Sequence, residues 1–73
     1  MYRTTRGEMN KEGAITAESL QRAVDVFARV QGRAPRRVLV RPGLEDGARL
    51  ALPAVRVVAG TRGILAGEIW LEL

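Results

Sequence analysis

Few side chains in this chain belong to the types that carry out chemistry. There is no cysteine, so the chain can form neither a disulfide nor a thiolate metal site, and it has no thiol nucleophile. There is no histidine either, which removes the usual general base and the commonest transition-metal ligand. Any catalysis would therefore depend on carboxylates, hydroxyls or backbone groups.

Three glycines in the run AGTRGILAG, at positions 60, 63 and 67, invite comparison with a phosphate-binding loop. Their spacing fits neither the Walker pattern nor the dinucleotide-binding fingerprint. No helix start follows them to supply an anion site. We therefore interpret them as turn glycines.

The remaining candidate groups lack the neighbours that catalysis requires. Glu45 and Asp46 stand together, but the alternating oxygen ligands of a calcium loop are missing. Glu8 and Glu12 lie in a segment with few apolar residues, which would hold a catalytic pair poorly. Ser19 has no candidate base beside it. The sequence predicts a protein that is not an enzyme, with no cofactor, metal or small-molecule substrate.

The charge balance is basic, with 12 lysine and arginine residues against 8 acidic residues and a net charge of +4. Such a balance favours polyanions or acidic protein surfaces as partners. A nucleic-acid-binding alternative would use the arginines for which we expect no carboxylate partner: Arg3, Arg6, Arg33, Arg36 and Arg62. Neither a helix-turn-helix pair nor an aromatic stacking platform accompanies them.

The length of 73 residues allows one domain at most, and a domain of this size buries only roughly 60% of its unfolded surface. Self-association is the remaining way to stabilise so small a core once disulfides and metals are excluded. No apolar run approaches the roughly 18 residues of a membrane span, and no signal-peptide segment follows Met1. We expect a soluble, cytoplasmic protein.

Residues 16–31 show the clearest local pattern. Leu20, Val24 and Phe27 recur at the three-and-four spacing of one helical face. Thr16 is a favourable N-cap, and Gly32 is the expected stop. The pattern predicts an amphipathic helix.

Three β-like runs follow the helix, at residues 36–41, 54–59 and 68–73, and prolines or glycines bound them. Residues 44–52 fit either one helical turn or a loop. Residues 1–14 are expected to form a flexible basic arm, or a short edge strand at residues 2–5 if another segment pairs with it. Residues 15–73 would then form one small α+β domain, with one amphipathic helix packed on one face of a mainly antiparallel, three- to four-stranded sheet.

Alternation along the strands divides the predicted sheet into two faces. One is aliphatic and should meet the helix; it carries Val38, Val40, Val55, Val57, Ala59, Ile69, Leu71 and Leu73. The other has an apolar centre with a rim of both charges; it carries Leu39, Val58 and Trp70 with Arg37, Arg41, Arg56, Glu68 and Glu72.

That second face leads to the main functional hypothesis. An apolar centre with a charged rim is typical of an interaction surface, and a rim of both signs suits a homodimer. We therefore expect the chain to self-associate or to bind a protein partner through this face. The alternative is that residues 1–14 or 44–52 fold over it and make Trp70 part of the core.

The segments APRRVLVRPG, LPAVRVVAG and GILAGEIWLEL, within residues 19–73, resemble part of the major capsid proteins of HK97-type phage shells. In those proteins a helix leads through a proline-containing turn into a strand, and a later hairpin closes with a glycine-containing strand. The resemblance implies a small phage or prophage protein built on a related α+β unit. It identifies no functional residue.

Overall fold

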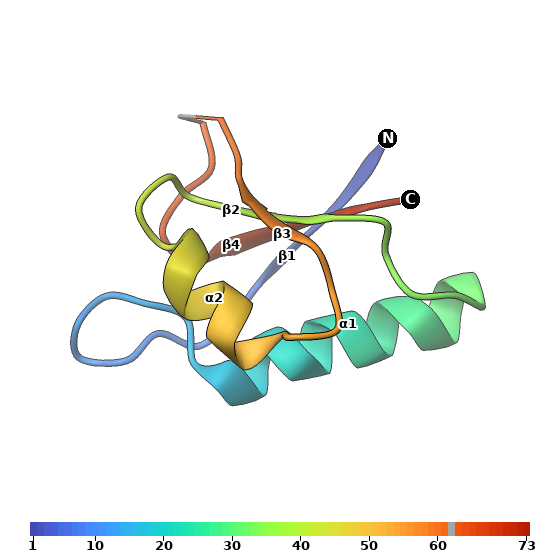
Figure 1. Ribbon diagram of the computed structural model, residues 1–73, viewed down its shortest axis with the longest axis horizontal. Coiled ribbons are helices and arrows are strands. Elements are labelled where there is room, and N and C mark those ends of the chain that lie inside the picture. Colours follow the sequence, from blue (N-terminus) through green and yellow to red (C-terminus); the bar gives the residue numbers. More distant parts are fainter. Residues whose placement is uncertain (62) are drawn as a thin grey trace.

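A computed structural model describes residues 1–61 and 63–73 of the chain (Figure 1). The elements follow one another in the order β1 (Tyr2–Arg6), α1 (Ala17–Gln31), β2 (Val38–Val40), α2 (Glu45–Ala51), β3 (Val57–Ala59) and β4 (Glu68–Glu72). The fold class is α+β, as predicted, with two helices and a four-stranded, mostly antiparallel sheet.

Helix α1 begins and ends where the sequence predicts. The hydroxyl of Thr16 accepts a hydrogen bond from the backbone N–H of Ser19, which caps the first turn. Gly32 takes a left-handed conformation with φ of 78°, and its N–H donates to the carbonyl of Ala28. Only glycine adopts this conformation without strain, so the helix ends at this point.

The sheet has the strand order β1-β4-β2-β3. Strand β4 pairs antiparallel with both β1 and β2, whereas β2 pairs parallel with β3. The parallel pair requires a crossover connection, and α2 lies within it. The possible strand at residues 2–5 is therefore real, one residue longer than expected, and lies at an edge of the sheet.

Helix α2 lies in residues 44–52, a segment for which the sequence did not distinguish one helical turn from a loop. It covers the same side of the sheet as α1, so two helices, not the expected one, pack on that side (Figure 1). Arg49 of α2 donates to the carbonyl of Val57 at 3.1 Å and ties the helix to β3.

The core lies between the two helices and the aliphatic face of the sheet, as predicted. Leu20, Val24 and Phe27 of α1 and Ala48 of α2 belong to one buried cluster with the inward-facing residues of β2, β3 and β4. Within the described residues, β1 adds no apolar side chain to this cluster, because Arg3 and Thr5 are the residues on its helix-facing side.

Three strands are shorter than the sequence pattern suggested, and β4 differs only by ending at Glu72 instead of residue 73. Strand β2 covers only Val38–Val40 of the expected residues 36–41, and β3 covers Val57–Ala59 of the expected residues 54–59. Turn bonds account for the difference at β3, since the N–H of Val55 donates to the carbonyl of Leu52. Before β2, the N–H of Arg36 donates to the carbonyl of Glu72, and the N–H of Glu72 donates to the carbonyl of Arg37. The backbone hydrogen bonds to β4 therefore begin before Val38.

Candidate functional site

The side of the sheet opposite the helices carries the residues of the predicted interaction surface, and we call it the Trp70 face. Register confirms the grouping, because Leu39 lies opposite both Trp70 and Val58 in neighbouring strands, so all three side chains share one face. The same register adds three residues of β1 to the face: Tyr2, Thr4 and Arg6.

Two aromatic rings pack together on the Trp70 face. The ring centroids of Tyr2 and Trp70 are 5.8 Å apart and the rings are tilted by 45°, within the range of favourable aromatic pairs. Tyr2 remains 40% exposed, whereas Trp70 is half-buried. The indole N–H of Trp70 is buried and has no acceptor among the described residues.

An ion pair lies beside the aromatic pair. Arg37 donates to both carboxylate oxygens of Glu72, from Nε at 2.9 Å and from Nη2 at 2.6 Å, and also to the hydroxyl of Tyr2 at 3.4 Å. These charge-assisted bonds lower the pKa of Glu72 to about 2 and raise the pKa of Arg37. Two residues of the predicted rim, one of each charge, are thus paired across neighbouring strands.

Leu39 does not lie at the exposed centre of this face as expected; it is only 7% exposed. A β-carbon on Gly60 would meet both the Leu39 β-carbon and the end of the Ile64 side chain, so these two side chains converge on Gly60. Ile64 is 1% exposed. Leu39 and Ile64 are both buried, and both lie outside the main core cluster. Leu39 is therefore covered by Ile64 of the β3–β4 connection. Of the two segments considered for this role, residues 1–14 contribute Tyr2, which packs against Trp70 but leaves it half-buried, and residues 44–52 contain α2 on the other side of the sheet.

The other predicted interface residues lie around this centre. Val58 is half-buried, and Arg41 and Arg56 are exposed. Glu68 accepts a hydrogen bond from the N–H of Leu65 at 2.9 Å, so it holds the β3–β4 connection instead of an arginine. Arg56 lines a hollow of about 320 Å³ together with Arg36, Arg37 and Glu72.

The arginines of the nucleic-acid alternative are divided between two parts of the molecule. Arg3 and Arg6 lie on β1, and both line a groove beside α1. Arg33 and Arg36 lie in the connection between α1 and β2, where Arg36 borders the hollow described above. Arg62 lies outside the described residues.

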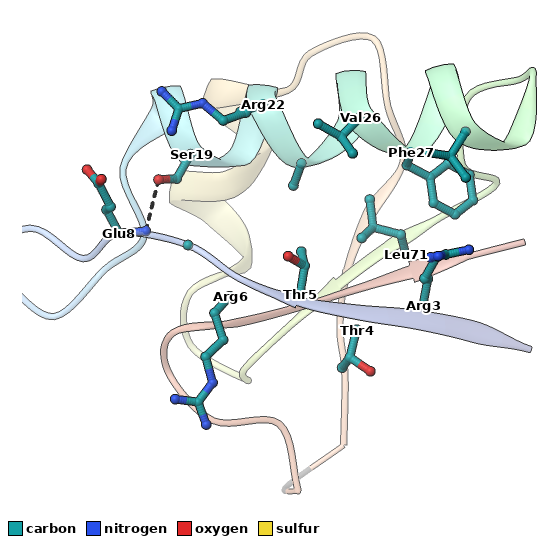
Figure 2. A pocket seen from close by; sticks show the side chains of 13 residues that line it. Arg3, Thr4, Thr5, Arg6, Glu8, Ser19, Arg22, Val26, Phe27 and Leu71 are labelled. Atoms are coloured by element: carbon teal, nitrogen blue, oxygen red, sulfur yellow. Dashed lines mark hydrogen bonds between the residues drawn. The ribbon is translucent and has the colours of Figure 1, made fainter.

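A groove that the sequence did not predict runs between β1 and α1 (Figure 2). We call it the β1–α1 groove; it has a volume of about 530 Å³. Its apolar lining comes mainly from α1, with Ala23, Val26, Phe27 and Val30. Val26 was available as a signal in the sequence, because it falls outside the stripe of Leu20, Val24 and Phe27. Val30 continues the spacing of that stripe and would be expected in the core, but it is 60% exposed.

The groups considered for chemistry have structural roles. The Ser19 hydroxyl accepts a hydrogen bond from the N–H of Glu8 at 2.9 Å (Figure 2), and the Glu45 carboxylate accepts one from the N–H of Gly43 at 2.8 Å. Within residues 1–61 and 63–73, no three acidic side chains gather into a set that could hold a metal ion. Nor does this part of the chain contain a helix long and apolar enough to span a membrane.

No protein-family model, curated protein or solved structure matches this chain. The resemblance to HK97-type capsid proteins therefore stays a prediction. Function has to be inferred from the two surfaces described above.

Proposed function

We propose that this chain is a non-enzymatic interaction module that forms a homodimer through the Trp70 face. The observation that carries the proposal is the contact between Tyr2, Trp70 and Arg37 on an accessible sheet face. Tryptophan, tyrosine and arginine are the residue types that contribute most to binding energy at protein interfaces.

The charges on this face favour a second copy as the partner. Arg41 and Arg56 are exposed there, while Glu68 and Glu72 are partly accessible. In a two-fold contact each patch meets its own copy, so a patch with both signs can complement itself. A standard interface buries about 800 Å² per partner, a modest part of the 4878 Å² surface of this chain.

Sedimentation over a dilution series from millimolar to micromolar protein tests the proposal. We expect the wild type to dimerise, and Trp70→Ala to remain monomeric at the same concentrations. Arg56→Glu should weaken the dimer about tenfold or more, because each dimer contains the change twice and like charges then oppose each other. Arg29→Glu is the matched control, since Arg29 is exposed on α1, away from this face, and the charge change is the same.

A wild type that stays monomeric throughout the series would overturn the homodimer. The same conclusion would follow if Arg56→Glu and Arg29→Glu had equal effects, because the interaction would then depend on net charge and not on the Trp70 face. Circular dichroism of each variant confirms that the comparison is made between folded proteins.

Nucleic-acid binding is a second candidate, and the hollow lined by Arg36, Arg37 and Arg56 favours it. Only one carboxylate, that of Glu72, balances these three guanidinium groups there. Binding of arbitrary DNA or RNA that weakens steeply with salt, and that falls in the double variant Arg36→Gln/Arg56→Gln, would support it. An absence of gel retardation at low salt would remove it.

A further inference from the structure

The outer edge of β1 is open. In an antiparallel pair, alternate residues direct their backbone N–H and C=O groups toward the partner strand. Gly7 donates to the carbonyl of Gly67 and Leu73 donates to that of Met1, so the odd-numbered residues of β1 face β4. The N–H and C=O groups of Tyr2, Thr4 and Arg6 therefore point away from the sheet, and no strand of the described chain pairs with them.

The β1–α1 groove runs along this open edge. Val26 is 50% exposed and Val30 60% exposed, although both lie on a helix whose other side enters the core. Figure 2 shows Thr5 pointing from β1 toward α1, with Thr4 and Arg6 pointing away from it. A strand laid against β1 would thus bring every second side chain under the helix, where these apolar residues lie.

The charge around the groove favours an acidic occupant. Arg3 and Arg22 line it on the helix side, Arg6 lines it from β1 with its side chain directed away from α1, and Glu8 is the acidic residue among its lining. The inner edge of β1 already pairs with a segment of this kind, since β4 has the sequence EIWLE and its Glu68 lies opposite Arg6. Alternating aliphatic and acidic residues therefore suit both the apolar lining and the arginines.

The groove is held in shape by the segment that follows β1. Glu8 donates its N–H to Ser19 and accepts at its carbonyl from the N–H of Thr16 at 2.8 Å. Gly7 packs so closely that a β-carbon there would lie 2.6 Å from Cγ2 of Ile15. A preformed edge and groove reduce the ordering cost of binding.

We propose that the β1 edge and the β1–α1 groove bind an extended, acidic segment of another protein by strand addition. Backbone bonds to Tyr2, Thr4 and Arg6 supply affinity, and the groove with its arginines selects aliphatic and acidic side chains. The groove lies across the sheet from the centre of the Trp70 face, whereas Tyr2, Thr4 and Arg6 belong to both the β1 edge and the Trp70 face. Strand addition does not depend on the homodimer.

The probe is a fluorescein-labelled peptide, Glu-Glu-Val-Thr-Val-Glu-Glu, with both ends blocked. Its sequence is symmetric, so its side-chain pattern suits either strand direction, and it places valines on one face between terminal glutamates. We expect a saturable rise in fluorescence anisotropy with the wild-type protein. In heteronuclear NMR spectra, the amide signals of Tyr2, Thr4 and Arg6 should shift more than those of Arg3 and Thr5.

Two altered peptides separate strand addition from charge attraction while the protein stays unchanged. The first is N-methylated at its three central residues, which keeps all charges and removes the central backbone donors. The second carries lysine in place of every glutamate. Each should bind about tenfold more weakly or worse. Equal binding of the N-methylated peptide would overturn the proposal, because charge alone would then explain the interaction.

A protein variant provides the complementary test. Thr4→Pro removes an outward N–H that β4 does not use, and proline is tolerated on such an edge. It should abolish peptide binding, whereas Thr4→Val, which keeps the N–H, should retain it. Retained binding by folded Thr4→Pro would contradict the proposal. So would edge amide signals that move on dilution of Trp70→Ala alone, in which the dimer through the Trp70 face is removed, since a second copy would then occupy β1.

Discussion

The Trp70 face and the β1–α1 groove lie on opposite sides of the same sheet, and the chain closes them to different degrees. On the Trp70 face, Ile64 covers Leu39, and Arg37 is bonded to Glu72. Along the groove, Val26 and Val30 remain exposed and the outer edge of β1 has no partner strand in the described chain. The face without a helix is thus partly covered, while the face with two helices keeps an opening.

The cause lies in the residues of β1. Strands β2 and β4 direct valine, isoleucine and leucine toward α1, whereas β1 directs Arg3 and Thr5. These polar side chains do not join the core, so α1 meets the edge strand across a groove. The core therefore ends at β4, and the groove lies at the next strand, β1.

The largest effect should come from removing the cover of the Trp70 face. Ile64→Ala truncates a side chain that is 1% exposed, and we expect it to lower the free energy of unfolding by about 2–5 kcal/mol. Urea denaturation measures the change. The control is Leu65→Ala, because Leu65 is 55% exposed and its truncation should cost less than about 0.5 kcal/mol. Similar costs for both would show that the β3–β4 connection does not seal this face.

The next effect concerns the close packing of Gly7, which lines the groove. In Gly7→Ala the new β-carbon would lie 2.6 Å from Cγ2 of Ile15 and 3.1 Å from Cβ of Ser19, so the Ile15 side chain or the backbone around Gly7 must shift. We expect a loss of about 1–3 kcal/mol in the free energy of unfolding.

Gly47→Ala provides the matched control for that substitution. A β-carbon at Gly47 has no neighbour within 4 Å, and the residue lies inside α2. Alanine should therefore stabilise the protein by up to about 1 kcal/mol through helix propensity. The midpoint temperature of thermal unfolding should fall in Gly7→Ala and rise in Gly47→Ala. A Gly7→Ala variant more stable than the wild type would mean that Gly7 is not tightly packed beside the groove.

The sequence predicted the features that depend on local chemistry. Thr16 and Gly32 mark the ends of α1 because each completes a hydrogen bond with its own neighbours. The assignment of Leu39, Val58 and Trp70 to one face followed from strand alternation alone, and the register agrees with it. These inferences need no knowledge of which strands are neighbours.

The features that the sequence did not predict depend on distant contacts. Helix α2 has no side-chain hydrogen bond from its N-cap residue Leu44 and contains Gly47, so its local signal is weak. Its packing on the core supports it. The burial of Leu39 required knowing that Ile64 returns over it. The groove required knowing that β1 pairs with β4, which places the edge strand beside Val26.

A smaller effect is expected where α1 joins the end of β1. Ser19→Ala leaves the N–H of Glu8 without its acceptor, which should cost about 1 kcal/mol. Hydrogen exchange of the Glu8 amide should become faster in the variant, by more than the variant's loss of global stability explains. Exchange of the Glu72 amide, which donates to the carbonyl of Arg37 across the sheet, serves as the internal control. An unchanged Glu8 amide would show that this bond does not hold the groove.

The smallest effect tests whether the ion pair on the Trp70 face contributes to folding. The folded-state pKa of Glu72, about 2, lies below its ordinary value of 4.5, because Arg37 donates hydrogen bonds to the ionised carboxylate. The unfolded state therefore takes up the proton first as the pH falls, and the contribution of the pair, complete above about pH 4.5, is lost between there and pH 2. The guanidinium is 39% exposed, so water screens the pair and the loss should be small. Over this interval the urea midpoint of the wild type should fall more than that of Glu72→Gln, in which every other carboxylate still titrates. Parallel curves would mean that the ion pair adds nothing to the free energy of unfolding. The closure of the Trp70 face, compared with the open groove, would then depend on Ile64 alone.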